Sequence, residues 1–212
     1  MKDPLGSMRP LERHELARLL SSCPRVELEA GESRGEGDFA GAMLVVIERG
    51  LAALATRAGP RRRMILSFCR ERAVLPPPAW AEELVAVSEC AIVAVTTEPY
   101  CRLLQLPTAA LAIVQALLAE LRQRDESLAQ FANVSHAERL RAKLQQLARS
   151  HGAVVDGGIR IELPLTHELL GQAIGSARET VTAALRTLEA EGFVVREGRR
   201  YRLLVSGDAL AA

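Results

Sequence analysis

Short apolar runs separated by turn signals dominate the chain from about Val26 to Glu98. Runs of this length between Gly- and Pro-containing segments are typical of β-strands, and a short helix over Leu11–Leu20 is predicted before them. Parallel strands would need helices between them, so the simplest closure is an all-β roll or barrel of about seven or eight strands. The clearest strands are Ala42–Ile47, Leu51–Ala55, Met64–Phe68, Leu84–Val87 and Ala91–Val95.

A long helix is predicted next, over Thr108–Ala132, because this stretch has no Gly or Pro and is rich in Ala, Leu, Gln, Glu and Arg. Apolar residues recur in it at alternating spacings of four and three, which is the pattern of a coiled-coil seam, with Arg124 as a polar interruption. We expect a parallel homodimer along this helix; the alternative is packing on its own domain. The expected seam residues are Val114, Leu117, Leu121, Leu128 and Phe131.

The last third of the chain alternates between helical and extended patterns. Gly175 lies in the turn between two predicted helices, and the small residues Gly171 and Ala173 allow these helices to approach closely. Helix, short turn, helix and a two-stranded wing form the layout of a winged helix-turn-helix. The predicted elements are a helix over Ala137–Arg149, a turn over Gly152–Gly158, a strand over Ile159–Leu163, helices over Thr166–Ile174 and Ala177–Glu191, and a hairpin of Phe193–Val195 with Arg199–Val205.

Composition narrows the class of protein. The 212 residues are 49% hydrophobic and 25% charged, which excludes a disordered chain. Lys+Arg number 27 against 26 Asp+Glu, so a uniformly basic nucleic-acid binder is excluded, although a local basic face is not. Because the sequence has neither a long apolar run nor a signal peptide pattern, we expect a soluble, cytoplasmic protein with no membrane partner.

The sequence lacks the common signatures of metal and catalytic sites. Its four cysteines, Cys23, Cys69, Cys90 and Cys101, are scattered without a C-x-x-C pair, so we expect small buried hydrophobes and no disulfide framework or metal site. We find no Gly-rich phosphate loop, H-E-x-x-H or G-x-S-x-G motif, and therefore expect no enzyme.

The candidate chemistry lies at the start of the second helix of the helix-turn-helix, where Arg178 and Glu179 fall in the first turn. That end points into the major groove in this motif. An Arg can donate two hydrogen bonds to a guanine edge, and a Glu can accept one from a cytosine amino group. The alternative is a solvated first turn in which Glu179 favours the helix dipole.

The segment Leu165–Val181, LTHELLGQAIGSARETV, resembles the signature of the CRP/FNR transcription regulators, above all in its G-Q-x-x-G-x-x-R-E-T-V core. The resemblance extends with lower specificity over the roll and the long helix. It implies a dimer that binds a palindromic DNA operator, together with RNA polymerase as a partner. Two positions depart from the family pattern, because Ala177 and Ala183 stand where Ser and Arg are expected.

The resemblance also implies a domain plan and a DNA-contacting set. The expected fold is α+β, with a β-roll sensor domain, a cyclic-nucleotide-binding-like double-stranded β-helix, over 8–106, a dimerisation helix and hinge over 107–135, and a winged helix-turn-helix over 136–212. Arg178 and Glu179 would read bases, and the other members would contact phosphates or the groove edge. The expected DNA-contacting residues are Thr166, His167, Ser176, Arg178, Glu179, Thr180, Thr182, Arg196, Arg199 and Arg200.

The sensor end departs from the family's cyclic-nucleotide pocket. Pro76-Pro77 replaces its Gly-Glu pair, and Trp80 lies near the position of its phosphate-binding Arg. Burying a cyclic phosphate without a guanidinium leaves an unpaired charge at a cost of several kcal/mol. We therefore do not expect cyclic AMP to bind there by the usual contacts.

Cyclic di-GMP is one candidate effector instead, because Arg122-Gln-Arg-Asp125 forms an R-x-x-D on the long helix, in which Asp can accept hydrogens of guanine. Solvated ion pairs are the structural alternative. A constitutive regulator without a ligand, or one that responds to cyclic AMP, redox or haem, also stays open. The candidate effector-binding residues are Arg61, Arg63, Arg122, Gln123, Arg124 and Asp125.

Overall fold

The computed structural model describes residues 10–57, 63–129 and 135–204, with side chains from residue 14 onward. Arg61 and Phe131, which the sequence placed in the effector set and the seam, lie outside these ranges. The chain divides into two compact units, 1–125 and 126–212. This division falls inside the long helix, whereas the sequence placed boundaries at 106/107 and 135/136.

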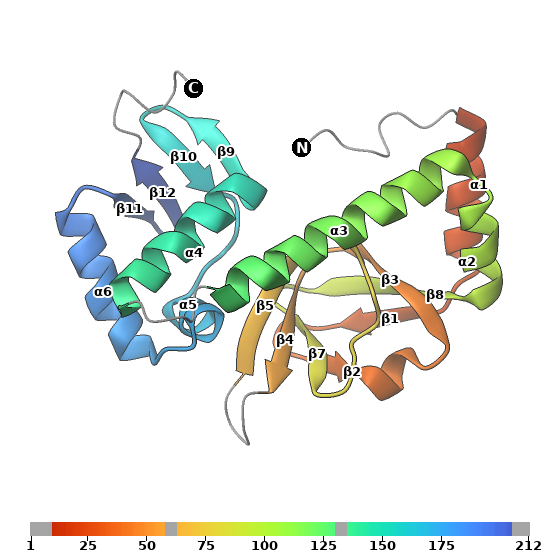
Figure 1. Cartoon of the computed structure of the whole chain (residues 1–212), viewed down its shortest axis with the longest axis horizontal. Helices are drawn as coiled ribbons and strands as arrows, with labels where there is room; N and C mark the ends of the chain where they lie inside the picture. The colour runs from red at the N-terminus through yellow and green to blue at the C-terminus, as the bar shows by residue number, and fades with distance from the viewer. Residues whose placement is uncertain (1–9, 58–62, 130–134, 205–212) are drawn as a thin grey trace. The chain divides into compact units, whose positions relative to one another are not determined.

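The first unit is built on two four-stranded antiparallel sheets, with strand orders β1-β8-β3-β6 and β2-β7-β4-β5 (Figure 1). The predicted strands are confirmed, and three shorter strands complete the roll. The two sheets form a roll rather than a closed barrel. The strands are β1 (Arg25–Leu28), β2 (Ser33–Gly35), β3 (Ala42–Arg49), β4 (Leu51–Arg57), β5 (Arg63–Arg70), β6 (Val74–Leu75), β7 (Glu82–Ala86) and β8 (Cys90–Thr96), with a short 3-10 helix at Glu36–Phe39.

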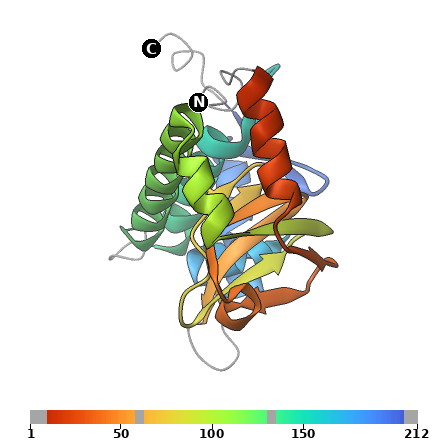
Figure 2. The same cartoon turned by 90° about the vertical axis from the view of Figure 1, so that its right-hand side faces the viewer.

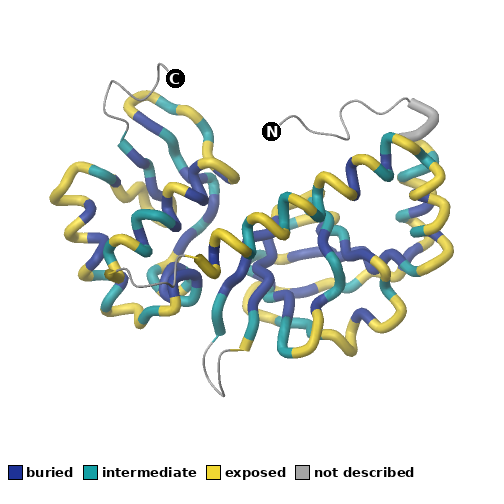
Figure 3. The backbone as a smooth tube through the Cα atoms, in the orientation of Figure 1, coloured by how far each residue is buried: buried dark blue, intermediate teal, exposed yellow. Residues whose placement is uncertain are grey.

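Strand β8 shows why these strands are apolar runs rather than alternating patterns. Its residue Ile92 packs between the two sheets, while Val93 and Val95 belong to a second core on the other face of the sheet. A strand that is covered on both faces has no solvent side, so both sets of alternating side chains are apolar. Figure 3 shows the resulting continuous burial along the central strands.

Three helices accompany the roll. The helix α1 (Pro10–Ser21) confirms the predicted N-terminal helix, and α3 (Pro107–Ala129) confirms the long one. The helix α2 (Thr97–Leu104), which the sequence analysis missed, lies between β8 and α3. Leu19, Leu103 and Ile113, one from each helix, join the second core, so the helices cover the outer face of the β1-β8-β3-β6 sheet (Figure 2).

Helices α2 and α3 follow one another with only Gln105 and Leu106 between them. Within the described residues, no single helix is long and apolar enough to cross a membrane. The pair α2 and α3, bent by 109°, would be long and apolar enough only if the two helices are counted together.

The second unit contains three helices and a four-stranded sheet of order β11-β12-β10-β9. The predicted turn over Gly152–Gly158 is wrong in part, because Gly152–Val155 pairs with the next strand and leaves a turn at its end. The four residues of this segment are followed by Asp and two glycines, which favour a turn, whereas pairing with β10 supplies the backbone hydrogen bonds of a strand. The elements are α4 (His136–His151), β9 (Gly152–Val155), β10 (Gly158–Ile161), α5 (His167–Ile174), α6 (Arg178–Ala190), β11 (Val194–Glu197) and β12 (Arg200–Leu204).

Candidate nucleic-acid interface and sensor face

The turn between α5 and α6 depends on two glycines. Gly175 ends α5 in the left-handed region, with φ 64°, and its N–H donates to the carbonyl of Gly171. A Cβ at Gly171 would lie 2.7 Å from the carbonyl oxygen of Ser176, so only a hydrogen fits there. The side chain of Thr166 caps the start of α5 by accepting from the N–H of Leu169. These contacts set the position at which α6 begins.

Helix α6 presents opposite faces to the core and to solvent. Val181, Leu185 and Leu188 are buried, while Arg178 and Glu179 are exposed in the first turn. With one face fixed by packing, the side chains of the first turn are held outward on a rigid element. That arrangement suits the reading of base edges.

Ser176, which lies two residues before α6, is tied to α4. Its hydroxyl lies 2.6 Å from Nδ1 of His136, and Arg139 donates to the carbonyl oxygen of Ile174 at 3.3 Å. The sequence analysis missed His136 and Arg139 because these contacts span 40 and 35 residues of chain. They hold the turn of the helix-turn-helix against α4.

His167 and Thr182 join α5 to α6. The Thr182 hydroxyl donates to the carbonyl of Arg178 at 3.0 Å, so Nδ1 of His167, at 2.8 Å, must donate to Thr182. Burial, and then the positive charges of Arg196 and Arg178, lower the pKa of His167, which keeps the ring neutral. Both side chains are thus engaged with one another inside the motif, and their contact with DNA stays a prediction.

The wing carries the basic side chains that the sequence singled out. Arg196, Arg199 and Arg200 are all exposed. Arg196 donates to the carbonyl of Gly198 at 2.9 Å, and Arg200 forms an ion pair with Glu162 at 3.0 Å. These contacts restrain two of the arginines at the surface without removing their charge from solvent.

Helix α3 bears a stripe of exposed apolar side chains in a register different from the predicted seam. Leu117 is half-buried and packs against the core of its own unit, whereas its neighbour Leu118 is 48% exposed. The seam itself stays a prediction. We call this surface the α3 stripe; its members are Leu111, Val114, Leu118, Leu121 and Leu128, which repeat at spacings of three, four and seven.

Arg124 points inward, so it neither interrupts the stripe nor faces solvent as an effector ligand would. It forms ion pairs with Glu82 of β7 at 3.0 Å and with Glu120 at 3.2 Å. Glu120 in turn accepts from the Ser67 hydroxyl at 2.7 Å. The sequence missed this because the pairing partner of Arg124 lies 42 residues away.

Arg63 is likewise committed within the roll. It donates to Glu83, whose side chain is only 3% exposed, at 2.5 Å. Burial acts to raise the pKa of Glu83, but the hydrogen bonds from Arg63 and Ser33 together with the positive charges of Arg63 and Arg57 hold it below its ordinary value. Arg63 is therefore a partner for a buried carboxylate, and its place in the effector set stays a prediction.

Of the remaining effector candidates, Arg122 and Asp125 are exposed on the outer side of α3, and Gln123 is half-buried. Trp80 lies in the loop between β6 and β7 and is 87% exposed. Within the part of the chain that the structure describes, no three His, Cys, Asp or Glu side chains come together as a metal site.

The cysteines follow the prediction in three cases and depart from it in one. Cys23, Cys69 and Cys90 are buried, whereas Cys101 is exposed. Burial raises the pKa of Cys69 to about 12, so this thiol stays protonated.

Comparisons with known proteins agree with this architecture. Residues 138–212 match the model of the Crp-like helix-turn-helix domain. A CRP-like cAMP-activated global transcriptional regulator of Mycobacterium tuberculosis is 31% identical over 87 residues, which are 41% of this chain and 39% of that protein. A global nitrogen regulator of Synechocystis is 35% identical over 82 residues, which are 39% of this chain and 36% of that protein. The matches thus span less than half of either relative.

Solved structures resemble nearly the whole chain. CooA from Carboxydothermus hydrogenoformans aligns with a TM-score of 0.78 at 18% identity, over 91% of this chain and 88% of that one. CLP of Xanthomonas campestris, described as a c-di-GMP responsive global regulator, aligns with a TM-score of 0.69 at 16% identity, over 92% and 100%. At these identities the likeness shows the fold.

The fold and the site define a class of protein: a β-roll and a long helix joined to a winged helix-turn-helix. Within that class, residues 138–212 match the Crp-like helix-turn-helix domain, and nearly the whole chain shares the fold of solved structures such as CooA and CLP.

Proposed function

We propose that this protein is a dimeric, sequence-specific DNA-binding regulator of transcription in which the first turn of α6 reads base edges in the major groove. The observation that carries the proposal is the outward position of Arg178 and Glu179 on a helix whose opposite face is buried. The names of the curated relatives, both transcription or nitrogen regulators, support it. RNA polymerase is the further partner that such a regulator would contact.

Dimerisation is supported by the α3 stripe. Its members Leu111, Leu121 and Leu128 are 58%, 55% and 54% exposed, which is unusual for large aliphatic side chains at regular helical spacing. Two copies of the stripe would bury one another in a parallel coiled-coil seam. A twofold dimer would present two recognition helices to half-sites one DNA turn, ~34 Å, apart.

The test of base reading is an operator selected from random duplex DNA with the purified protein, followed by fluorescence anisotropy on that operator. Arg178→Ala is expected to weaken binding by about 1–3 kcal/mol and to relax selectivity at one base pair. Arg186→Ala is the matched control, because it removes the same charge from an exposed position nearer the end of α6. An Arg178→Ala protein that keeps full operator selectivity would refute the assignment.

Effector control is the finer part of the proposal, and cyclic di-GMP is its candidate ligand. Arg122 and Asp125 are exposed on one side of α3, where two copies would approach across the seam, and the fold neighbour CLP is described as responsive to this nucleotide. Cyclic AMP is disfavoured, because Glu82 and Glu120 lie between the β2-β7-β4-β5 sheet and α3 and would repel a cyclic phosphate there.

Calorimetry with cyclic di-GMP and with cyclic AMP separates these outcomes. Binding of cyclic di-GMP that is lost in Arg122→Ala and kept in Arg102→Ala, an exposed arginine of α2, would support the assignment. Operator affinity that no nucleotide changes would favour the alternative, a constitutive regulator whose roll serves only the dimer.

A further inference from the structure

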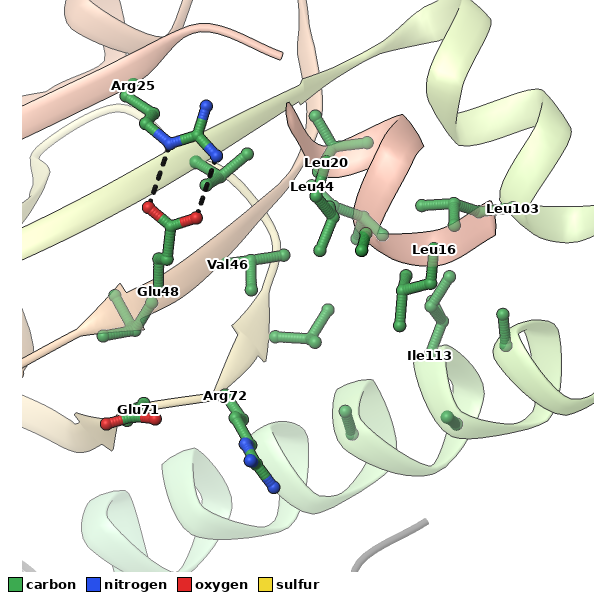
Figure 4. A pocket seen from close by; sticks show the side chains of 18 residues that line it. Leu16, Leu20, Arg25, Leu44, Val46, Glu48, Glu71, Arg72, Leu103 and Ile113 are labelled. Carbon is green, nitrogen blue, oxygen red and sulfur yellow. Dashed lines mark hydrogen bonds and ion pairs between the residues drawn. The ribbon is translucent and has the colours of Figure 1, made fainter. Parts of the chain in front are cut away.

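The first unit holds an aliphatic pocket of about 420 Å³ between α1, α3 and the outer face of the β1-β8-β3-β6 sheet (Figure 4). Its charged lining residues balance one another. Arg25 is held by Glu48 through two hydrogen bonds of 2.9 Å. Glu71 and Arg72, which also line the pocket, carry opposite charges. A more selective chemistry lies in the second unit, in a polar cluster at the start of α4.

That cluster joins His136, the first residue of α4, to the turn of the helix-turn-helix. Nδ1 of the His136 ring lies 2.6 Å from the Ser176 hydroxyl and 3.0 Å from one terminal nitrogen of Arg139. The other terminal nitrogen of Arg139 donates to the carbonyl oxygen of Ile174 at 3.3 Å. One edge of the His136 ring is therefore held against the turn that leads into α6.

These contacts decide which nitrogen of the His136 ring carries the proton. A guanidinium group can only donate, so Nδ1 must present its lone pair to Arg139. The neutral ring then carries its hydrogen on Nε2. Ser176 must in turn donate its hydroxyl hydrogen to Nδ1, and that hydrogen is no longer available to an acceptor outside the protein.

The donor that this cluster offers to solvent is therefore His136 rather than Ser176. His136 is exposed, and Nε2 has no hydrogen-bond partner among the residues that the structure describes. The carboxylate of Glu138, in the same turn of α4, does not compete for the ring. It accepts from the backbone N–H and the hydroxyl of Ser135, at 2.9 and 2.8 Å.

The place of the ring beside α6 selects the acceptor. In a helix-turn-helix, the N-terminal end of the recognition helix enters the major groove, and the elements that flank it cross the phosphate backbone. Ser176, which the ring contacts, lies two residues before Arg178 in the first turn of α6. An N–H group at the flank of this turn suits an anionic phosphate oxygen, because hydrogen bonds to charged acceptors are the stronger ones.

We propose that Nε2 of His136 donates a hydrogen bond to a phosphate oxygen of the DNA backbone, with Arg139 and Ser176 as the positioning residues that fix the ring for this contact. Ser176 then acts on DNA through the ring, without donating to it directly. The phosphate contact rests on the proposed function because it needs bound DNA, whereas the position of the ring proton is a property of the protein alone.

The position of the proton is measured first, in the full-length protein without DNA. Long-range ¹H–¹⁵N spectra of protein labelled with ¹⁵N-histidine, at about pH 8, distinguish a ring protonated on Nε2 from one protonated on Nδ1. The spectrum of His136→Asn assigns the signals by the set that disappears. The Nε2–H form is expected for His136, and the Nδ1–H form would overturn the inference.

Two variants then separate the two edges of the ring on the selected operator. His136→Asn keeps an oxygen acceptor where Nδ1 lies and removes the outward donor. His136→Gln extends an amide N–H to the position of Nε2. By fluorescence anisotropy, His136→Asn is expected to weaken binding about tenfold for each half-site, and His136→Gln to restore most of that loss. Because a phosphate carries no sequence information, the ratio of operator to non-operator affinity should stay unchanged.

The phosphate is located from the DNA side, with operators that carry one neutral methylphosphonate per half-site, placed at each backbone position in turn. At one position the substitution is expected to weaken the wild type about tenfold and to weaken His136→Asn little further, because the two changes remove the same contact. Methylphosphonates that weaken both proteins equally at every position would overturn the proposal.

The remaining outcomes separate this contact from the proposed function. A wild type that binds its operator while His136→Asn binds equally well overturns the phosphate contact and leaves the proposed function standing. A His136→Asn protein that loses selectivity between operator and non-operator DNA also overturns it, since base reading would then depend on the ring. A wild type that binds no duplex DNA overturns both.

Discussion

Replacing Lys143 with Met is expected to change how the stability of the second unit depends on pH. Lys143 lies on α4 and is 2% exposed. Its ammonium group donates to the Ser127 hydroxyl at 2.9 Å and to the Gln146 side-chain carbonyl at 2.8 Å, both neutral acceptors. Burial lowers the pKa of Lys143 from 10.5 to about 8, and the nearby charge of Glu126 opposes this shift only in part.

The magnitude follows from the two protonation equilibria. At pH 7 the lysine is charged in both states, and holding the charge in the fold costs about 3 kcal/mol relative to the unfolded chain. Between pH 8 and pH 10.5 the unfolded chain binds more protons than the fold, so the stability contributed by this group rises with pH. From pH 7 to pH 9.5 the wild type should gain about 2 kcal/mol that Lys143→Met does not.

Urea unfolding at several pH values from 7 to 9.5, followed by circular dichroism, measures this difference. Comparison of the variant with the wild type cancels the thiols and tyrosines that both proteins share. Arg149→Met is the matched control, because it removes an exposed cation from the same helix that stays charged throughout this range. Wild-type and Lys143→Met stabilities that change in parallel with pH would refute the reasoning.

Two further substitutions test the packing that positions the DNA surface and the dimer. Gly171→Ala should destabilise the second unit by about 1–3 kcal/mol in thermal unfolding, because its Cβ would lie 2.7 Å from the Ser176 carbonyl oxygen. Gly37→Ala, with nothing within 4 Å, should not do so, and equal effects would contradict the close approach. Leu121→Lys should convert the dimer to a monomer by light scattering at micromolar concentration, whereas Leu104→Lys, an exposed leucine of α2, should not. An unchanged mass for Leu121→Lys would remove the α3 stripe from the dimer.

Local signals in the sequence predicted most of the elements. The long helix followed from the absence of Gly and Pro, and the helix-turn-helix from a capping Thr166, the turn at Gly175 and apolar residues at helical spacing. The sequence did not predict helix α2, because this helix is only eight residues long and joins a strand directly to another helix. Strand β9 was missed for a different reason, because its pairing with β10 rather than its own pattern makes it a strand.

The sequence alone could not identify pairs of interacting side chains that lie far apart in the chain. Charge and spacing made Arg63 and Arg124 look like open cations on a predicted ligand surface. Tertiary structure instead brings Glu83 and Glu82 to them across 20 and 42 residues, because a buried carboxylate needs a guanidinium beside it. The hydrogen bond between His167 and Thr182, which lie 15 residues apart, was equally out of reach of local patterns.

The amino-acid order alone indicated the strands of the roll, the long helix and the helix-turn-helix, since strand and helix patterns, caps and turns depend on residues that are close in the chain. Only the tertiary structure decided which face of α3 is apolar and exposed, which arginines are already paired, and that a pocket lies behind Ala112. The spacing of apolar residues along a helix is compatible with more than one buried face. Which face is buried depends on where the sheet packs against the helix.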